Sequence, residues 1–401
     1  MKARSLFKMH LRHFISAPRL RLTLPQIIYA VPELESNIYF NNVIDSAIPG
    51  SYTVEVKCDA GTQGNSRWFW TPSPEDAGKE FSLELRVFND LGLIASAKSK
   101  VVVAREQEVR TKKFTLALLA DSGVNNRYPD HILELMRERG YTGYTPIGKH
   151  SGNGNPVVPG GVAHDGYGGF EWNCFLDRWF YSSDELPLAQ SEAEREQMIS
   201  FGIRDNLKTR TYLLRSPLLK LENGKKVLDI QGWLKAINQG NAPDFIIIQL
   251  GGNDMFTAEE ENLNKRVKKV MANARKLISE LKKHAPNAIF GIATGSCGCG
   301  QDGFGENYKC LQSGYQYRRN IQRYNTELAK LVKKLNDPKI SLVPIHQAID
   351  PEGSYIKKEY PIHARSKEKV MRFSNALHQS PEGGYQMGDA IACWIINHLK
   401  K

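Results

Sequence analysis

An alternation of apolar β-type runs with amphipathic helical segments, from residue 113 onwards, constrains the fold more than any other feature. The run 245–250, apolar except for Gln249, has the composition of a strand that is buried on both faces of a sheet. Further strands are predicted at 114–119, 289–292 and 340–345, and helices at 129–139, 263–281, 317–335 and 382–399. This alternation predicts the α/β class, with a parallel sheet covered by helices on both faces.

Residues 26–108 follow a different pattern. Short runs rich in β-branched and aromatic residues alternate with turn signals such as Pro49-Gly50, and they lie at 27–31, 52–56, 67–70, 81–87 and 99–103. This spacing predicts a small all-β sandwich of immunoglobulin-like type. The predicted domains are therefore 26–108 and 113–401, joined by a charged linker at 105–113 and preceded by a segment, 1–25, of unclear role.

The composition is that of a soluble globular protein, with 41% apolar and 24% charged residues. The net charge is +11, but the basic residues are spread out, and clusters such as 265–269 lie on helical patterns. They indicate solvated helix faces, so we expect no nucleic-acid partner; the alternative would require salt-dependent association with DNA or RNA. No apolar run of about 18 residues is present, which predicts no membrane span.

The basic N-terminal residues are interrupted by charges where a secretory signal needs an unbroken apolar core, so there is no clear signal peptide. The compartment, whether secreted, periplasmic or other, stays open, as does the oligomeric state. Six cysteines are too few for a disulfide scaffold. Cys297, Cys299 and Cys310 resemble part of a metal motif but lack a matching second pair. We therefore interpret them as loop cysteines with room for one disulfide, and expect neither metal nor cofactor.

Two polar segments follow predicted strands and therefore lie at the carboxyl edge of the sheet, where open α/β folds bind ligands. Ser122 comes just after the run 114–119 and is a candidate nucleophile, although a plain turn is the commoner use of such a serine. Asn253 comes just after the run 245–250. Its amide can donate a hydrogen bond to a developing oxyanion, although capping of the next helix is the simpler interpretation.

Two further segments can supply the remaining chemistry. His378 precedes the last helix, and histidine is suited by its ordinary pKa to act as a base near neutral pH, although a single loop histidine is more often merely exposed. The glycines of 166–169 allow backbone N–H groups to approach a ligand closely, or simply form a flexible loop.

In their order along the chain, the four segments resemble the four sequence blocks of the SGNH, or GDSL-type, hydrolases. The blocks stand here at 120–122 (Ala-Asp-Ser), 166–169, 251–254 (Gly-Gly-Asn-Asp) and 375–378 (Asn-Ala-Leu-His). The resemblance covers about 113–401 and implies a three-layer αβα, flavodoxin-like hydrolase domain. Residues 301–308 and 375–389 are also similar to family members that carry a β-rich domain ahead of the hydrolase.

The resemblance implies a role for each block. Ser122 attacks an ester carbonyl, and His378 takes its proton and delivers it to the leaving alcohol. The oxyanion is held by the Ser122 backbone N–H, by a glycine N–H and by the Asn253 side chain. Gly169 is the first choice for the glycine and Gly166 the second.

This sequence departs from the family pattern at two positions. Ala120 replaces the usual glycine, and Asn375 replaces the acid three residues before His378. The carbonyl of Asn375 can orient the imidazole but cannot stabilise imidazolium by charge. Activity then rests on a Ser–His pair, or on an acid from elsewhere such as Asp350.

The function implied is that of a serine esterase acting on small acyl esters, acetyl esters above all, with a carbohydrate as one class of alcohol. Aromatic side chains near the glycine block suit stacking on sugar rings, although aromatic residues more often fill cores: Tyr167, Phe170, Trp172, Trp179 and Phe180. Hydrolysis of lipid acyl esters or thioesters is an alternative. A non-catalytic carbohydrate-binding protein on the same scaffold is another, motivated by Asn375.

Overall fold

The computed structural model describes residues 20–46, 48–151, 155–156, 161–179 and 215–399. Its centre is a sheet in which β10 (Phe114–Ala120), β17 (Phe245–Gln249), β18 (Ile289–Ala293) and β19 (Ile340–Val343) run parallel in that order. On its other side, β10 pairs with β11 (Tyr144–Ile147) and, nearer its carboxyl end, with β14 (Ala163–Gly166). Two short antiparallel strands extend that edge: β12 (His150–Ser151) and β13 (Asn155–Pro156).

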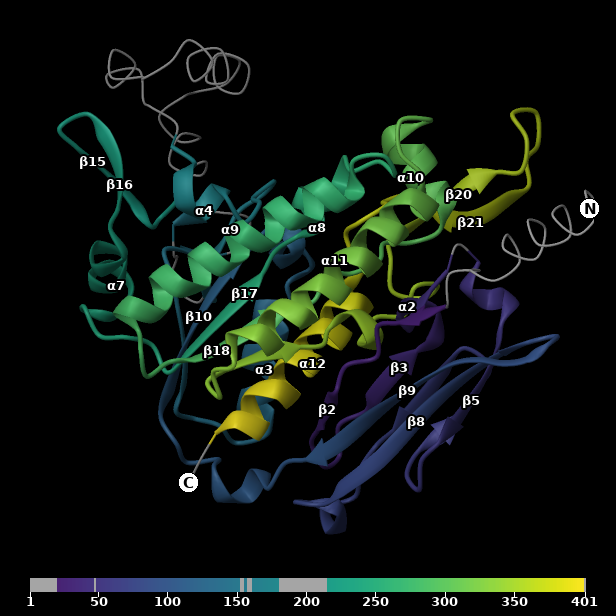
Figure 1. The fold of residues 1–401 in the computed structure, drawn as a ribbon, viewed down its shortest axis with the longest axis horizontal. Coiled ribbons are helices and arrows are strands. Elements are labelled where there is room, and N and C mark those ends of the chain that lie inside the picture. Colours follow the sequence, from purple (N-terminus) through teal and green to yellow (C-terminus); the bar gives the residue numbers. More distant parts are fainter. Residues whose placement is uncertain (1–19, 47, 152–154, 157–160, 180–214, 400–401) are drawn as a thin grey trace, which may run out of the picture.

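Helices cover both faces of this sheet (Figure 1). One face packs against α7 (Ile230–Asn238), α9 (Leu263–His284) and α11 (Gly314–Leu335), and the other against α3 (Tyr128–Glu138) and α12 (Pro381–His398). Side chains of β17 alternate between the two cores, with Ile246 and Ile248 in the first and Phe245 and Ile247 in the second. This explains why the first four residues of the strand are all apolar, and the arrangement confirms the mixed α/β prediction. The flavodoxin-like assignment stays a prediction.

The N-terminal part contains two sheets that share one hydrophobic core, which includes Trp68, Leu83 and Val101. One sheet has the order β2 (Ile27–Ala30), β9 (Gly92–Val103), β8 (Glu80–Asn89), β5 (Thr53–Lys57); the other has β3 (Ser36–Tyr39), β7 (Arg67–Trp70), β6 (Thr62–Gln63). The pairing of β2 with β9 is parallel, whereas the other pairings are antiparallel. Two sheets around one core agree with the predicted sandwich, while the immunoglobulin-like type and the domain boundaries stay predictions.

The remaining helices and strands are short. They are β1 (Arg21–Leu22), α2 (Phe40–Val43), β4 (Ile44–Asp45), α4 (Cys174–Asp177), β15 (Leu219–Glu222), β16 (Lys225–Leu228), α8 (Gly252–Phe256), α10 (Gln301–Tyr308), β20 (Lys357–Pro361) and β21 (Lys369–Phe373). Among the residues described, no helix combines the length and the apolar character needed to cross a membrane.

Buried hydrogen bonds fix the N-terminal sheets to the α/β part. Asn42, 3% exposed, donates from Nδ2 to the carbonyl oxygens of His346 at 2.9 Å and Ile349 at 2.7 Å. The segment expected to be a linker contains the buried Glu106, whose carboxylate is bound by Arg139 of the α3 C-terminus at 2.5 and 2.6 Å. This segment is therefore held against α3 rather than being a free spacer.

Candidate active site

Ser122 lies where β10 ends at the carboxyl edge of the sheet. Asp121 caps the short 3-10 turn Ser122–Asn126, because its side chain accepts the Gly123 backbone N–H at 2.8 Å. Burial raises the pKa of the Asp121 carboxyl to about 6. Gly123 leaves no room for a side chain, since an added Cβ would lie 2.8 Å from Oε1 of Gln249. The turn therefore holds Ser122 in one place.

The side chains of Ser122 and His378 meet, although they are 256 positions apart in the sequence. The Ser122 Oγ lies 3.0 Å from Nε2 of His378. His378 belongs to the loop between β21 and α12, and Asn307 of α10 holds this loop by accepting the Ala376 backbone N–H at 2.8 Å. Burial lowers the pKa of His378, which favours the neutral imidazole that a general base requires.

Asn375 does not orient the imidazole in the way expected from the sequence. Its Oδ1 accepts the backbone N–H groups of Leu377 at 3.1 Å and His378 at 2.9 Å, so it shapes the loop that carries the histidine. The side chain of Asp350 caps its own turn, accepting the Glu352 N–H at 2.9 Å. Within the part of the chain that the structure describes, no carboxylate is hydrogen-bonded to the His378 ring, so the arrangement is a Ser–His pair.

Asn253, in the first turn of α8, faces the same cavity as Ser122 and His378. Its Nδ2 donates one hydrogen bond to the Phe170 carbonyl at 3.0 Å, which fixes the amide and leaves the second N–H of the group for another acceptor. The turn before α8 depends on Gly251, whose φ is +112°. An added Cβ there would lie 2.3 Å from the Tyr324 ring.

The two glycines proposed for the oxyanion site, Gly166 and Gly169, differ in whether their backbone N–H groups are free to bind a substrate. The N–H of Gly166 is buried and donates to Nδ1 of His164 at 3.1 Å, which excludes it as a donor to substrate. Gly169 is exposed, has a φ of +71° and precedes Phe170, the residue bound by Asn253. Gly169 does not line the cavity itself, so only Ser122, His378 and Asn253 of the predicted set are brought together there.

The cavity is small, with a volume of about 50 Å³. Its apolar wall is formed by Ile345, Leu377 and Met387. Its polar lining includes Ser296 and Gln379, which the sequence analysis missed. Ser296 could have been noticed, because it follows the predicted strand 289–292 at the same edge of the sheet. A larger cavity of about 640 Å³ lies between residues 22–29 and α11 and contains none of the predicted site residues.

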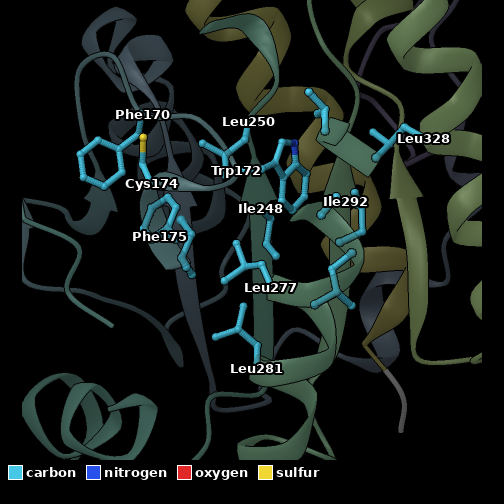
Figure 2. Close-up of a cluster of buried hydrophobic side chains, with 14 of the residues drawn as sticks. Phe170, Trp172, Cys174, Phe175, Ile248, Leu250, Leu277, Leu281, Ile292 and Leu328 are labelled. Atoms are coloured by element: carbon cyan, nitrogen blue, oxygen red, sulfur yellow. The ribbon is translucent and has the colours of Figure 1, made fainter. Parts of the chain in front are cut away.

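Three of the aromatic residues near the glycine block are core residues rather than a sugar-stacking surface. Tyr167, Phe170 and Trp172 are at most 2% exposed and belong to the core beside β17. Figure 2 shows Phe170 and Trp172 among the apolar side chains of this core. Trp179 is partly buried beneath the guanidinium of Arg215. Phe180 lies outside the described residues.

The aspartate that follows Asn253 also has a structural role. Asp254 is buried and accepts the Trp172 backbone N–H at 3.2 Å, and burial raises the pKa of its carboxyl to about 8. All six cysteines are free thiols. In the described segments, no three His, Cys, Asp or Glu side chains gather in a way that could hold a metal ion.

A family model described as GDSL-like lipase/acylhydrolase matches residues 194–391. The matched region contains Asn253 and His378, whereas Ser122 and Gly169 precede it. No curated protein matches the chain.

Several solved structures are similar at low identity. A carbohydrate esterase family 3 protein from Talaromyces cellulolyticus is 11% identical, with a TM-score of 0.39, over 71% of this chain and 98% of that one. A family 3 carbohydrate esterase from Clostridium thermocellum is 15% identical, with a TM-score of 0.35, over 70% and 94%. A carbohydrate esterase family 2 enzyme plus carbohydrate-binding domain from Corynascus thermopiles is 10% identical, with a TM-score of 0.34, over 92% and 91%. TM-scores of this size carry no argument about the substrate of this protein.

Proposed function

We propose that this chain is a serine esterase for small acyl esters, of the GDSL-like lipase/acylhydrolase type whose family model matches residues 194–391. The proposal is carried by the 3.0 Å contact between the Ser122 Oγ and Nε2 of His378. A hydroxyl and an imidazole at this distance have the geometry of an activated nucleophile and its base. They lie in a cavity that also contains an amide donor, from Asn253.

In the proposed reaction, the Ser122 Oγ attacks the carbonyl carbon while Nε2 of His378 takes the hydroxyl proton. The Ser122 backbone N–H and the second N–H of the Asn253 amide stabilise the oxyanion, and Gly169 is the third proposed donor. His378 then protonates the leaving alcohol, and a water molecule activated by the same imidazole hydrolyses the acyl-enzyme. Because Asn375 is neutral, the imidazolium formed in each step has no charged partner from that residue.

The size of the cavity supports a short acyl group. One water-sized group needs about 10–15 Å³, so a volume of about 50 Å³ accommodates roughly four such groups. A space of this size suits an acetyl group better than a long acyl chain. We therefore propose acetyl esters as the preferred class. For the alcohol half we propose a carbohydrate or a similar polyol, with Ser296 and Gln379 of the polar lining as support.

Hydrolysis of p-nitrophenyl acetate and p-nitrophenyl octanoate by the purified protein tests this function. We expect kcat/KM to be higher for the acetate, and Ser122→Ala to lower it at least about 1,000-fold. Ser341→Ala, which changes a partly buried serine of β19 that does not line the cavity, serves as the control and should leave the rate unchanged. Equal rates for wild type and Ser122→Ala would contradict the proposal and favour a binding protein. A preference for the octanoate would favour the lipid-ester alternative.

A further inference from the structure

A cluster of three polar side chains lies against the cavity and has no part in the proposed reaction steps. Ser296 follows β18, is half-buried and lines the cavity. Gln379 also lines the cavity and is 6% exposed, and Tyr355, 3% exposed, lies behind the two. Their hydrogen bonds determine which group the cluster presents to a substrate.

The orientation of the Gln379 amide is fixed by its neighbours. Its Oε1 accepts a hydrogen bond from Nδ2 of Asn126 at 3.0 Å. Its Nε2 therefore points the other way and donates to the Ser296 Oγ at 3.1 Å and to the Tyr355 hydroxyl at 3.5 Å. Both hydroxyl groups thus accept from the same amide.

The hydroxyl groups of Ser296 and Tyr355 are also hydrogen-bonded to each other. Tyr355 is buried, and among the described residues its hydroxyl is hydrogen-bonded to Ser296 and Gln379 only. Since Nε2 of Gln379 is a donor, the buried O–H of Tyr355 has one acceptor in reach, the Ser296 Oγ, and leaving it unpaired would be costly. Burial raises the pKa of Tyr355 to about 12, so this proton is present at neutral pH.

Ser296 then accepts two hydrogen bonds, which occupy both lone pairs of its hydroxyl. The Ser296 hydroxyl proton has no acceptor within the cluster, so the O–H is directed toward the cavity. The cavity wall therefore carries a hydrogen-bond donor that is held in position by Tyr355 and Gln379.

We infer that Ser296 donates this hydrogen bond to an oxygen atom on the alcohol half of the ester, and so selects esters whose alcohol carries a hydroxyl beside the ester bond. The inference rests on the proposed function. Gln379, which holds Ser296, is the residue next to His378, and His378 delivers the proton to the leaving alcohol. Because Ser296 and His378 line the same cavity, an alcohol half that takes its proton from His378 comes within reach of Ser296. Polyols such as carbohydrates can accept the Ser296 hydrogen bond, whereas simple alcohols cannot.

Two acetate esters that differ by one hydroxyl test the inference: 2-hydroxyethyl acetate and ethyl acetate. We expect wild type to prefer the first, and Ser296→Ala to lower the ratio of the two kcat/KM values about three- to tenfold, the usual effect of one hydrogen bond. The rate on ethyl acetate should change less than about twofold, because that ester offers no acceptor at this position. Ser341→Ala is the matched control and should leave both rates unchanged.

The outcomes separate this inference from the proposed function. A fall of equal size for both esters would overturn the inference, because Ser296 would then act through the His378 loop, and an unchanged ratio would overturn it too. Absence of any Ser122-dependent hydrolysis in wild type would instead reject the esterase itself. If Ser296→Ala does not fold, Ser296→Cys gives the same comparison, because a thiol is a much weaker donor.

Discussion

Asn375 occupies the position where the family pattern has an acid, and it leaves His378 without a charged partner from this residue. The proposed base must be neutral, and burial lowers its pKa, so kcat/KM should fall only when the pH drops below the ordinary histidine value of 6.5. Asn375→Asp places a carboxylate on the same loop. Its negative charge favours imidazolium and raises the pKa of His378, so the acidic limb of the pH–rate profile should shift to higher pH by about 0.5–1 pH unit.

A pH profile of kcat/KM for both proteins measures this change. Asn336→Asp, at the C-terminal cap of α11, controls for the added charge and should leave the limb in place. A limb that moves equally in both variants, or not at all in Asn375→Asp, would show that the titrating group is not His378 beside residue 375.

Single residues were predictable where the sequence fixes their place on an element. Ser122 and Asn253 each follow an apolar strand, and His378 precedes a helix, so their meeting at one sheet edge could be expected. The hydrogen-bond partner of Asn375 could not be predicted, because an amide beside a turn can bond either to a ring nitrogen or to a backbone N–H with similar free energy. The role of Ser296 as a hydrogen-bond donor could not be predicted from the sequence either, since it depends on Tyr355 and Gln379, which are distant in the sequence.

At the scale of elements, the β17–α8 turn determines where Asn253 lies, and this turn requires glycine at 251. Gly251→Ala combines a strained φ of +112° with a contact of 2.3 Å to the buried Tyr324 ring. Tyr324 cannot move away freely, because its hydroxyl donates to the Leu250 carbonyl at 2.9 Å and accepts from Nε1 of Trp172 at 3.0 Å.

We expect Gly251→Ala to lower the free energy of unfolding by about 2–4 kcal/mol. Urea denaturation measures the loss. Gly305→Ala in α10, where an added Cβ meets nothing within 4 Å, is the control and should be neutral or slightly stabilising. A Gly251→Ala protein as stable as wild type would mean that the turn can rearrange.

Long elements were predicted to within a few residues, because their periodicity extends over several turns. Helix α9 was expected at 263–281 and extends over Leu263–His284. Short strands were not predicted: β12 has two residues, and β14, Ala163–Gly166, is a glycine-containing run without alternation. They form by pairing at the edge of the sheet beside β10, and a pattern of two to four residues cannot reveal that partner.

For the whole molecule, the buried Asn42 joins the N-terminal sheets to the α/β part. Asn42→Ala leaves the carbonyl oxygens of His346 and Ile349 buried without this donor, which costs about 2–4 kcal/mol in the free energy of unfolding. Thermal denaturation should show a lower midpoint, while kcat/KM at 25 °C stays close to that of wild type.

Asn41→Ala is the neighbouring control. The contact that Asn41 makes with the α/β part is through its backbone carbonyl, which accepts from Nη1 of Arg318 at 2.6 Å and is retained in the variant. Equal midpoints for the two variants would mean that the Asn42 hydrogen bonds contribute little to holding the two parts together.

The position of the Ser122–His378 pair also makes activity depend on a contact between distant parts of the chain. Ser122 follows β10, the first strand of the α/β part, and His378 precedes α12, its last helix, so 256 positions separate the two side chains. Bringing the two side chains together closes a large loop of the chain, which has an entropic cost. In the proposed enzyme, partly assembled chains are therefore inactive however much secondary structure they contain. The onset of hydrolysis during refolding then reports the time at which Ser122 and the loop before α12 have come together.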